Sequence, residues 1–247
     1  MDAAGDDGPL MKSSLFESTQ PVNDERRWAK QNAHSVRVGL GPDVLAVKGT
    51  MTSFRGNVNF HHEKSGSMAK LAKKIVTSED VSLMRVSGQG EVWFAQEAGY
   101  VFTLDLENEG ISLNVRNLLA FDATLTWDIN RIKGAGIMAG NGLFNTTVTG
   151  AGTVAVSVIG RPLVLDCSQA PVAVDPNSAV AWSSHLAPTI NNSMNMSSML
   201  RGGSGEAVQY VFHGPGFVVI QAYEWTRLQQ AEQKGKSALG SALDLFS

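Results

Sequence analysis

The segment Gly150-Ala151-Gly152-Thr153-Val154-Ala155-Val156 decides the fold of this chain. Two glycines flank one residue and lead into alternating apolar positions, the pattern of a β-strand. The same order recurs in Gly88-Gln89-Gly90 before Glu91-Val92-Trp93-Phe94 and in Gly214-Pro215-Gly216 before Phe217-Val218-Val219-Ile220. The three glycine pairs begin 62 and 64 residues apart, so the chain repeats one β-unit.

A second landmark repeats with nearly the same period. Leu118-Leu119-Ala120-Phe121 and Ala179-Val180-Ala181-Trp182 both end on alanine followed by an aromatic residue, and they lie 61 residues apart. Two landmarks at one period favour stacked copies of one unit. The stretch 36–60 is either a further, degenerate copy or the missing part of the last copy, and the sequence leaves both open.

The composition is that of an ordinary globular protein with enough apolar side chains for a large core. Of the 247 residues, 43% are hydrophobic and 17% charged. The formal net charge of −3 argues against a general nucleic-acid binder. Cys167 is the only cysteine, which excludes an intrachain disulfide, and its apolar surroundings predict a small buried side chain rather than a reactive thiol.

Hydrophobic patterning divides the chain into three parts. We expect a flexible N-terminal tail over 1–34 with a short strand at 14–16, a repeated β domain over 35–225, and a C-terminal helical tail over 226–247. Apolar residues at helical spacing predict a short helical insert near 68–76. The predicted fold is therefore all-β, with the units forming one continuous body.

The targeting features of the sequence favour the cytoplasm. The N-terminal residues are acidic and small, without the basic and apolar regions of a secretory signal. The sequence contains no run of about 18 apolar residues that would span a bilayer.

Six motifs follow one another along the chain. They are Val36-Arg-Val-Gly-Leu40, Gly49-Thr-Met51 with Gly56-Asn-Val58, Gly88-Gln-Gly90-Glu-Val92, Leu119-Ala-Phe121, Gly150-Ala-Gly152-Thr-Val154 and Gly214-Pro-Gly216-Phe-Val218. In this order, they resemble the altered-inheritance-of-mitochondria (AIM twenty-four) family, which is described as similar to the tryptophan RNA-binding attenuation protein (TRAP) fold. The resemblance covers about 36–223.

The resemblance implies repeated small TRAP-like β-sandwich units related to a double-stranded β-helix, assembled into homo-oligomers. It implies no catalytic residue and no cofactor. Mitochondrial members are linked to inner-membrane organisation, and many others are bacterial cytoplasmic proteins. Because the chain lacks an Arg- and Ser-rich amphipathic start, it resembles the bacterial kind.

Two short glycine motifs suggest a nucleotide-binding loop or a hydrolase, but neither has the required sequence context. Gly134-X-Gly136-X-X-Ala139 fits a loose dinucleotide fingerprint, but Gly140-Asn141-Gly142 follows where a helix is required. Gly203-Ser204-Gly205 lacks the spacing of a nucleophile elbow. We therefore expect neither a nucleotide-binding loop nor a hydrolase.

His61-His62-Glu63 is the best candidate for a metal site. Alternation along a strand places His61 and Glu63 on one face, and a third ligand would have to come from a distant strand. His213 is the candidate for that third ligand, with His185 and His34 as the other choices. The simpler interpretation is a solvated strand end without metal.

Two segments are candidates for contact with a partner or a lipid surface. Lys70, Lys73 and Lys74 form the core of the only basic cluster, beside the apolar stripe of the predicted insert. Leu228 and Phe246 lie on a weak apolar stripe of the predicted C-terminal helix. The simpler interpretation of the lysines is a solvated face of a small helix.

These observations predict a non-enzymatic, homo-oligomeric β-scaffold, of three copies by the resemblance and the repeat count. It would bind an unknown protein partner or a membrane-associated assembly, with peripheral membrane contact, some of its aromatic residues serving assembly. One alternative is a metal-dependent, cupin-like enzyme using His61, Glu63 and a remote histidine. The other is an RNA-binding ring, which the acidic net charge and the few aromatics beside the lysines disfavour.

Overall fold

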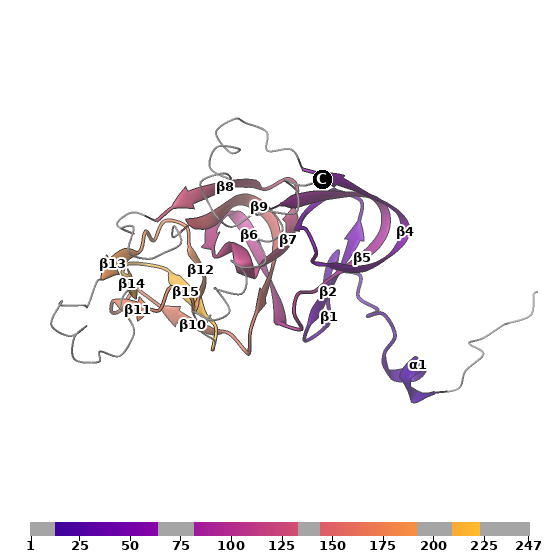
Figure 1. The fold of residues 1–247 in the computed structure, drawn as a ribbon, viewed down its shortest axis with the longest axis horizontal. Coiled ribbons are helices and arrows are strands. Elements are labelled where there is room, and N and C mark those ends of the chain that lie inside the picture. Colours follow the sequence, from indigo (N-terminus) through magenta and orange to yellow (C-terminus); the bar gives the residue numbers. More distant parts are fainter. Residues whose placement is uncertain (1–12, 64–81, 133–143, 192–208, 223–247) are drawn as a thin grey trace, which may run out of the picture.

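The structure is a computed structural model that describes residues 13–63, 82–132, 144–191 and 209–222 (Figure 1). Strands dominate it, which confirms the all-β prediction. The helical insert predicted near 68–76 and the helix predicted after 226 lie outside the described residues. The elements are α1 (Ser14–Ser18), β1 (Trp28–Asn32), β2 (Ser35–Leu40), β3 (Val44–Val47), β4 (Met51–His62), β5 (Leu83–Phe94), β6 (Tyr100–Leu113), the 3₁₀ turn η1 (Val115–Asn117), β7 (Leu118–Asp122), β8 (Thr126–Arg131), β9 (Phe144–Val158), β10 (Leu163–Asp166), β11 (Val172–Val174), β12 (Ala179–Ser183), β13 (Thr189–Asn191), β14 (Gln209–Phe212) and β15 (Phe217–Ile220).

The strands form two open, antiparallel sheets. The larger has the order β1-β2-β5-β3-β7-β9-β6-β12-β15-β10, with β4 added to β5 and β8 added to β9. The smaller has the order β11-β14-β13. The order of the larger sheet runs from the N-terminal strands β1 and β2 to the yellow β15 and the orange β10 (Figure 1).

Strand pairing divides the chain into three equivalent units, each built around a Gly-X-Gly pair that lies within one long central strand or, in the third unit, between two consecutive strands. In the first unit β5 lies between β2 with β3 and β4. In the second unit β9 lies between β6 and β7 with β8. In the third unit β14 and β15 lie between β10 with β11 and β12 with β13. The stretch 36–60 therefore holds three strands of the first copy, β2, β3 and most of β4, and is not a part of the last one.

The register confirms this equivalence residue by residue. Two residues after the second glycine, Val92, Val154 and Val218 stand opposite Phe54, Phe121 and Trp182. In each unit the partner strand has an irregular register just before that aromatic residue: between Met51 and Ser53, between Leu118 and Ala120, and between Ala179 and Ala181. A shared β-bulge at the same position indicates that the three units have one architecture.

The Gly-X-Gly pairs bend the central strands. All six glycines have positive φ angles, from 115° to 153°. Residues of β9 before Gly150 pair with β8, and those after Gly152 pair with β7. The third unit divides in the same way, since β14 pairs with β13 and β15 with β12. The glycines are thus strand bends.

Neighbouring units join edge to edge through the same two strand segments. β3 of the first unit pairs with β7 of the second, and β6 of the second pairs with β12 of the third. Both joining strands, β7 and β12, are buried at all five residues. The core of the molecule therefore runs continuously through both junctions.

The N-terminal boundary differs from the predicted tail over 1–34. Residues 28–32 form β1, which pairs with β2, and Trp28 and Ala29 are buried. Arg27 and Trp28 both donate hydrogen bonds to the Asp122 carboxylate, which ties β1 to the second unit. The expected strand at 14–16 is instead the short helix α1, whose first N–H groups are capped by Ser13.

Replacing Gly90 with alanine will strongly destabilise the fold. Gly90 has a φ of 140°, and an added Cβ would lie 2.0 Å from the Arg55 carbonyl oxygen. Backbone strain and this clash are expected to lower the free energy of unfolding by about 2–4 kcal/mol, measured by urea denaturation.

Gly39→Ala is the matched control on the neighbouring strand β2. Its nearest atom would be the Arg27 carbonyl oxygen at 3.8 Å, an ordinary contact. The free energy of unfolding should change by less than about 1 kcal/mol. Equal losses in the two variants would contradict a special role of the Gly-X-Gly bend.

Candidate functional site

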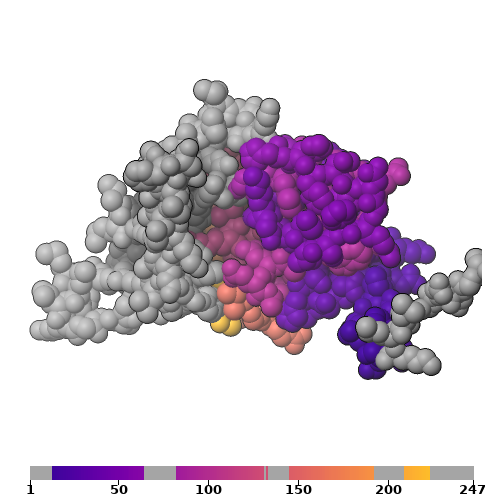
Figure 2. Space-filling model, turned by 45° about the vertical axis from the view of Figure 1, so that its right-hand side comes forward, coloured from indigo at the N-terminus to yellow at the C-terminus, as the bar shows by residue number. Residues whose placement is uncertain are grey.

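The most unusual surface of the described chain is the strand β4. It is 12 residues long, and six consecutive residues from Thr52 to Asn57 are exposed. A strand covered on one face would alternate between buried and exposed residues. Within the described ranges β4 pairs with one strand, β5, so its outer edge presents unpaired backbone groups. Figure 2 shows the purple segment that contains β4 as a broad surface facing the viewer.

Phe54 is the exposed anchor of this edge. Its side chain is 49% exposed and packs edge-on against Phe60, with ring centroids 5.3 Å apart. Its equivalents in the other units, Phe121 and Trp182, are 0% and 2% exposed. They are buried because a strand of the preceding unit pairs alongside each of them, whereas Phe54 has no such neighbour among the described strands.

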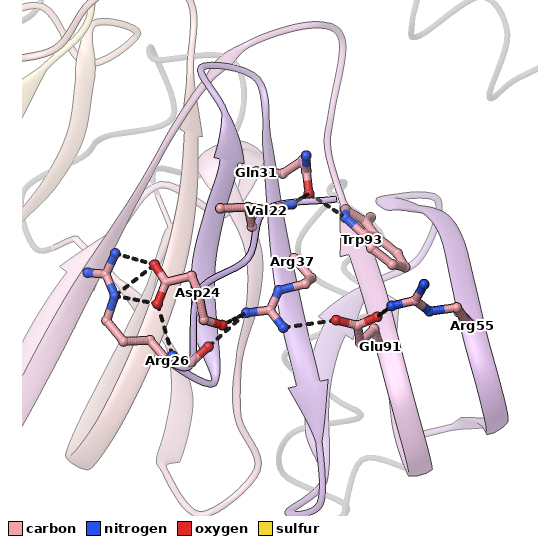
Figure 3. A network of polar contacts seen from close by, with 8 residues as sticks. All are labelled: Val22, Asp24, Arg26, Gln31, Arg37, Arg55, Glu91 and Trp93. Carbon is pink, nitrogen blue, oxygen red and sulfur yellow. Dashed lines mark hydrogen bonds and ion pairs between the residues drawn. The ribbon is translucent and has the colours of Figure 1, made fainter. Parts of the chain in front are cut away.

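Three charged side chains hold the exposed strand against the sheet. Glu91 on β5 accepts hydrogen bonds from Arg37 on β2, at 2.9 Å, and from Arg55 on β4 (Figure 3). Arg37 also donates to the carbonyl oxygens of Asp24, at 2.5 Å, and Arg26, at 3.0 Å. The network therefore spans β2, β5 and β4 and fixes the chain that leads into β1.

The charges of this network shift two carboxylate pKa values. Partial burial acts to raise the pKa of Glu91, but hydrogen bonds from Arg37 and Arg55 outweigh it, and the pKa is lowered. Hydrogen bonds from the Arg26 side chain and backbone lower the pKa of Asp24 to about 2. Both carboxylates are therefore ionised at neutral pH and serve as fixed acceptors.

Two neighbouring contacts complete this end of the molecule. Gln31 on β1 accepts hydrogen bonds from the Trp93 indole N–H, at 3.1 Å, and from the Val22 backbone, at 2.9 Å (Figure 3). A pocket of about 430 Å³ lies at the start of β4, next to the buried and unpaired Oε1 of Gln96. The segment before β4 and the turn after β5 line it: Lys48, Gly49, Thr50, Thr52, Ala95, Gln96, Glu97 and Ala98.

The structure does not bring the metal candidates together. His61 is exposed at the end of β4, and His213 directly follows β14, two strands at opposite ends of the molecule in Figure 1. The Glu63 carboxylate is held by Arg85 through two hydrogen bonds of 2.9 and 3.0 Å. Across the described ranges, no three His, Cys, Asp or Glu side chains gather as metal ligands would.

The remaining candidates have different outcomes. Lys70, Lys73, Lys74, Leu228 and Phe246 lie outside the described residues. Cys167 is fully buried, as predicted, and burial raises the pKa of its thiol. In the part of the chain that the structure describes, no helix has the length and apolar character needed to cross a membrane.

Sequence reasoning missed Phe54 and its network because the repeat is irregular there. The aromatic residue precedes the second glycine of its unit by 36 residues for Phe54, but by 31 for Phe121 and 34 for Trp182. In addition, serine replaces the alanine that precedes the aromatic residue in the other two units. The β-bulge before Phe54, visible only in strand pairing, shows that Phe54 is the counterpart of Phe121 and Trp182.

In the described residues, fold and surface together define a protein of three β-units with a long exposed strand edge at β4. Residues 28–223 match the family described as Mitochondrial biogenesis AIM24, and the chain belongs to this family. An uncharacterized protein of Streptococcus pyogenes serotype M6 is 26% identical over 194 residues, which cover 74% of this chain and 77% of that protein. The crystal structure of a Streptococcus pyogenes protein has the same fold, with a TM-score of 0.62 and 22% identity over 85% of this chain and 97% of that one.

Glu91→Gln will test the network that holds β4. The substitution removes the charge between Arg37 and Arg55, and Arg37 has a side chain only 9% exposed. We expect the free energy of unfolding at pH 7 to fall by about 1–3 kcal/mol. Because the folded-state pKa of Glu91 is lowered, its contribution is full above the unfolded value of about 4.3 and is lost as pH falls through the folded value.

The difference between wild type and Glu91→Gln should therefore shrink as pH falls from 5 towards 3, measured by urea denaturation at each pH. Glu107→Gln, at an exposed position of β6, is the control and should change the free energy of unfolding by less than about 0.5 kcal/mol. A pH-independent loss in Glu91→Gln would refute the ionic role of Glu91.

Proposed function

We propose that this protein is a non-enzymatic, homo-oligomeric β-scaffold that binds a protein partner or a membrane-associated assembly. The observation that supports this proposal most is the exposed edge of β4 with Phe54. Long exposed strand edges promote uncontrolled pairing, and natural proteins usually shorten, charge or cover them. An edge of 12 residues held in place by an ionic network is a surface suited to strand pairing with another molecule.

The rest of the proposal follows the family resemblance. We propose a trimer of the bacterial, cytoplasmic kind, with TRAP-like units as its building blocks. A single, fully buried cysteine is compatible with a reducing compartment. The metal-enzyme alternative gains no support from the described residues, since Arg85 holds Glu63. The lysines on which the RNA-ring alternative depends lie outside the described residues.

Light scattering coupled to size-exclusion chromatography will test the oligomer. We expect a mass three times the 26.4 kDa of one chain at micromolar concentration. A mass of one chain at every concentration measured would contradict the scaffold proposal as a whole. A different multiple would keep the oligomer and correct the number of copies.

A pull-down from native lysate will test the partner. The full chain should retain a specific protein or membrane fraction, and a chain lacking 226–247 should lose it if Leu228 and Phe246 contribute to binding. Equal recovery with the two chains would assign binding to the β-units. Recovery of nothing by either chain would contradict the partner proposal and leave the oligomer to the mass measurement.

A further inference from the structure

We propose that copies of this chain join head to tail, with β11 of one copy pairing alongside β4 of the next. This inference rests on the proposed homo-oligomer and specifies its interface. The occupant of the exposed β4 edge is thus a second copy of the chain. The argument starts from the two junctions already present inside each chain.

Both internal junctions use the same pair of segments in the same register. At the first junction, Ala46, Leu45 and Val44 of β3 stand opposite Ala120, Phe121 and Asp122 of β7. At the second, Leu113, Ser112 and Ile111 of β6 stand opposite Ala181, Trp182 and Ser183 of β12. In each case, the joining strand pairs with the aromatic residue that directly follows the bulge of its unit, Phe121 or Trp182.

The register within the units shows that the two β3 and β6 segments are equivalent. Val44 pairs with Val86 and Ile111 with Val148, two residues before the first glycine of the central strand in each unit. Val172 of β11 pairs with Phe212, also two residues before the first glycine of its unit. β11 is therefore the joining segment of the third unit.

Three units in a row leave one half of a junction unused at each end. At the first unit, the unused half is the start of β4, with Phe54 at the position of Phe121 and Trp182. At the third unit it is β11, whose single partner among the described strands is β14. These two edges have the complementary halves of a junction that the chain forms twice, but they are not paired with each other within the chain.

Copying the internal register predicts the contacts between two molecules. Val174 of one copy would stand opposite Ser53 of the next, Ala173 opposite Phe54, and Val172 opposite Arg55. Ala173 is exposed in the single chain, and its equivalents beside Phe121 and Trp182 are Leu45 and Ser112. The aromatic position thus tolerates both a small and a larger neighbour, and alanine leaves room for the Phe54 ring.

An ion pair within the first unit holds β4 in place. At the positions equivalent to Arg55, the Asp122 carboxylate and the Ser183 hydroxyl accept hydrogen bonds from the backbone N–H that follows the second glycine. Arg55 instead pairs with the Glu91 side chain, so an ion pair within the first unit holds β4 against β5. The edge is thereby preorganised for pairing, which lowers the entropic cost of association.

A head-to-tail contact has consequences that a symmetric contact lacks. Each copy offers one β4 edge and one β11 edge, so addition continues until a ring closes or a filament grows. A ring leaves neither edge exposed. An unrelated strand added to β4 would bury Phe54 equally well, but it would leave the complementary β11 edge unexplained.

Disulfide trapping in the full chain tests the register. The double variant Ser53→Cys/Val174→Cys places thiols on directly opposite residues of neighbouring copies, within the range of a disulfide. We expect covalent dimers and higher species on a non-reducing gel after mild oxidation. Each single variant should give none, because the contact needs one residue of each kind, and the native Cys167 is fully buried.

Ser53→Cys/Ala173→Cys is the matched control for register. A shift of one residue turns the second thiol to the opposite face of the sheet, so cross-linking should be lost or at least strongly reduced. Cross-linking by Ser53→Cys alone would show that two β4 edges pair symmetrically, which overturns the proposal. Equal cross-linking by both double variants would overturn the register.

Phe54→Glu tests the interface without a thiol. The residue is exposed in the single chain, so the variant should fold, with the circular dichroism spectrum of wild type. We expect the dissociation constant of the oligomer to rise on the order of 100-fold. Phe16→Glu changes another exposed aromatic residue, on α1, and should leave the oligomer intact.

The outcomes separate this inference from the proposed function. A monomeric wild type overturns both. An oligomeric wild type that survives Phe54→Glu and shows no cross-link in Ser53→Cys/Val174→Cys overturns the head-to-tail contact alone. Loss of the oligomer in Phe54→Glu together with the predicted cross-link supports both.

Discussion

The fold depends on one backbone constraint, a bend at two glycines with positive φ in the centre of every unit. Residues other than glycine rarely adopt this backbone conformation. In the first unit, a Cβ at Gly90 would also clash with the backbone of Arg55 on β4. The bend lets one strand pair with different neighbours before and after it. Three strands thereby wrap around a shared core instead of forming a flat ribbon.

Repetition of the unit explains where strand edges are covered and where they are not. Each internal junction buries an aromatic residue, Phe121 or Trp182, and satisfies the backbone groups on both sides. At the first unit the equivalent aromatic residue, Phe54, stays exposed because no strand of the described residues pairs along the outer edge of β4. Phe54, Phe121 and Trp182 are all aromatic and occupy the same place in their units. Whether each one is buried or exposed therefore depends on which unit it belongs to.

The N-terminal strand and the Glu91 network adapt the first unit to its terminal place. β1 covers the outer side of β2, and Asp122 at the first junction anchors it through Arg27 and Trp28. Glu91 of β5 binds Arg37 of β2 on one side and Arg55 of β4 on the other. In the other units, a backbone N–H of the central strand instead donates to Asp122 or Ser183 of the strand equivalent to β4. Ionic contacts thus stabilise an edge that packing leaves open.

The sequence by itself determined the repeat, the strand character and the family, because these depend on local residue patterns and on short-range alternation. It also placed Cys167 in the core. Only the tertiary structure decided that 36–60 belongs to the first unit, that residues 28–32 join the sheet, that Arg85 engages Glu63, and that Phe54 is the counterpart of Phe121 and Trp182. Strand pairing joins residues far apart in the chain, and connections of unequal length hide that register from any fixed period.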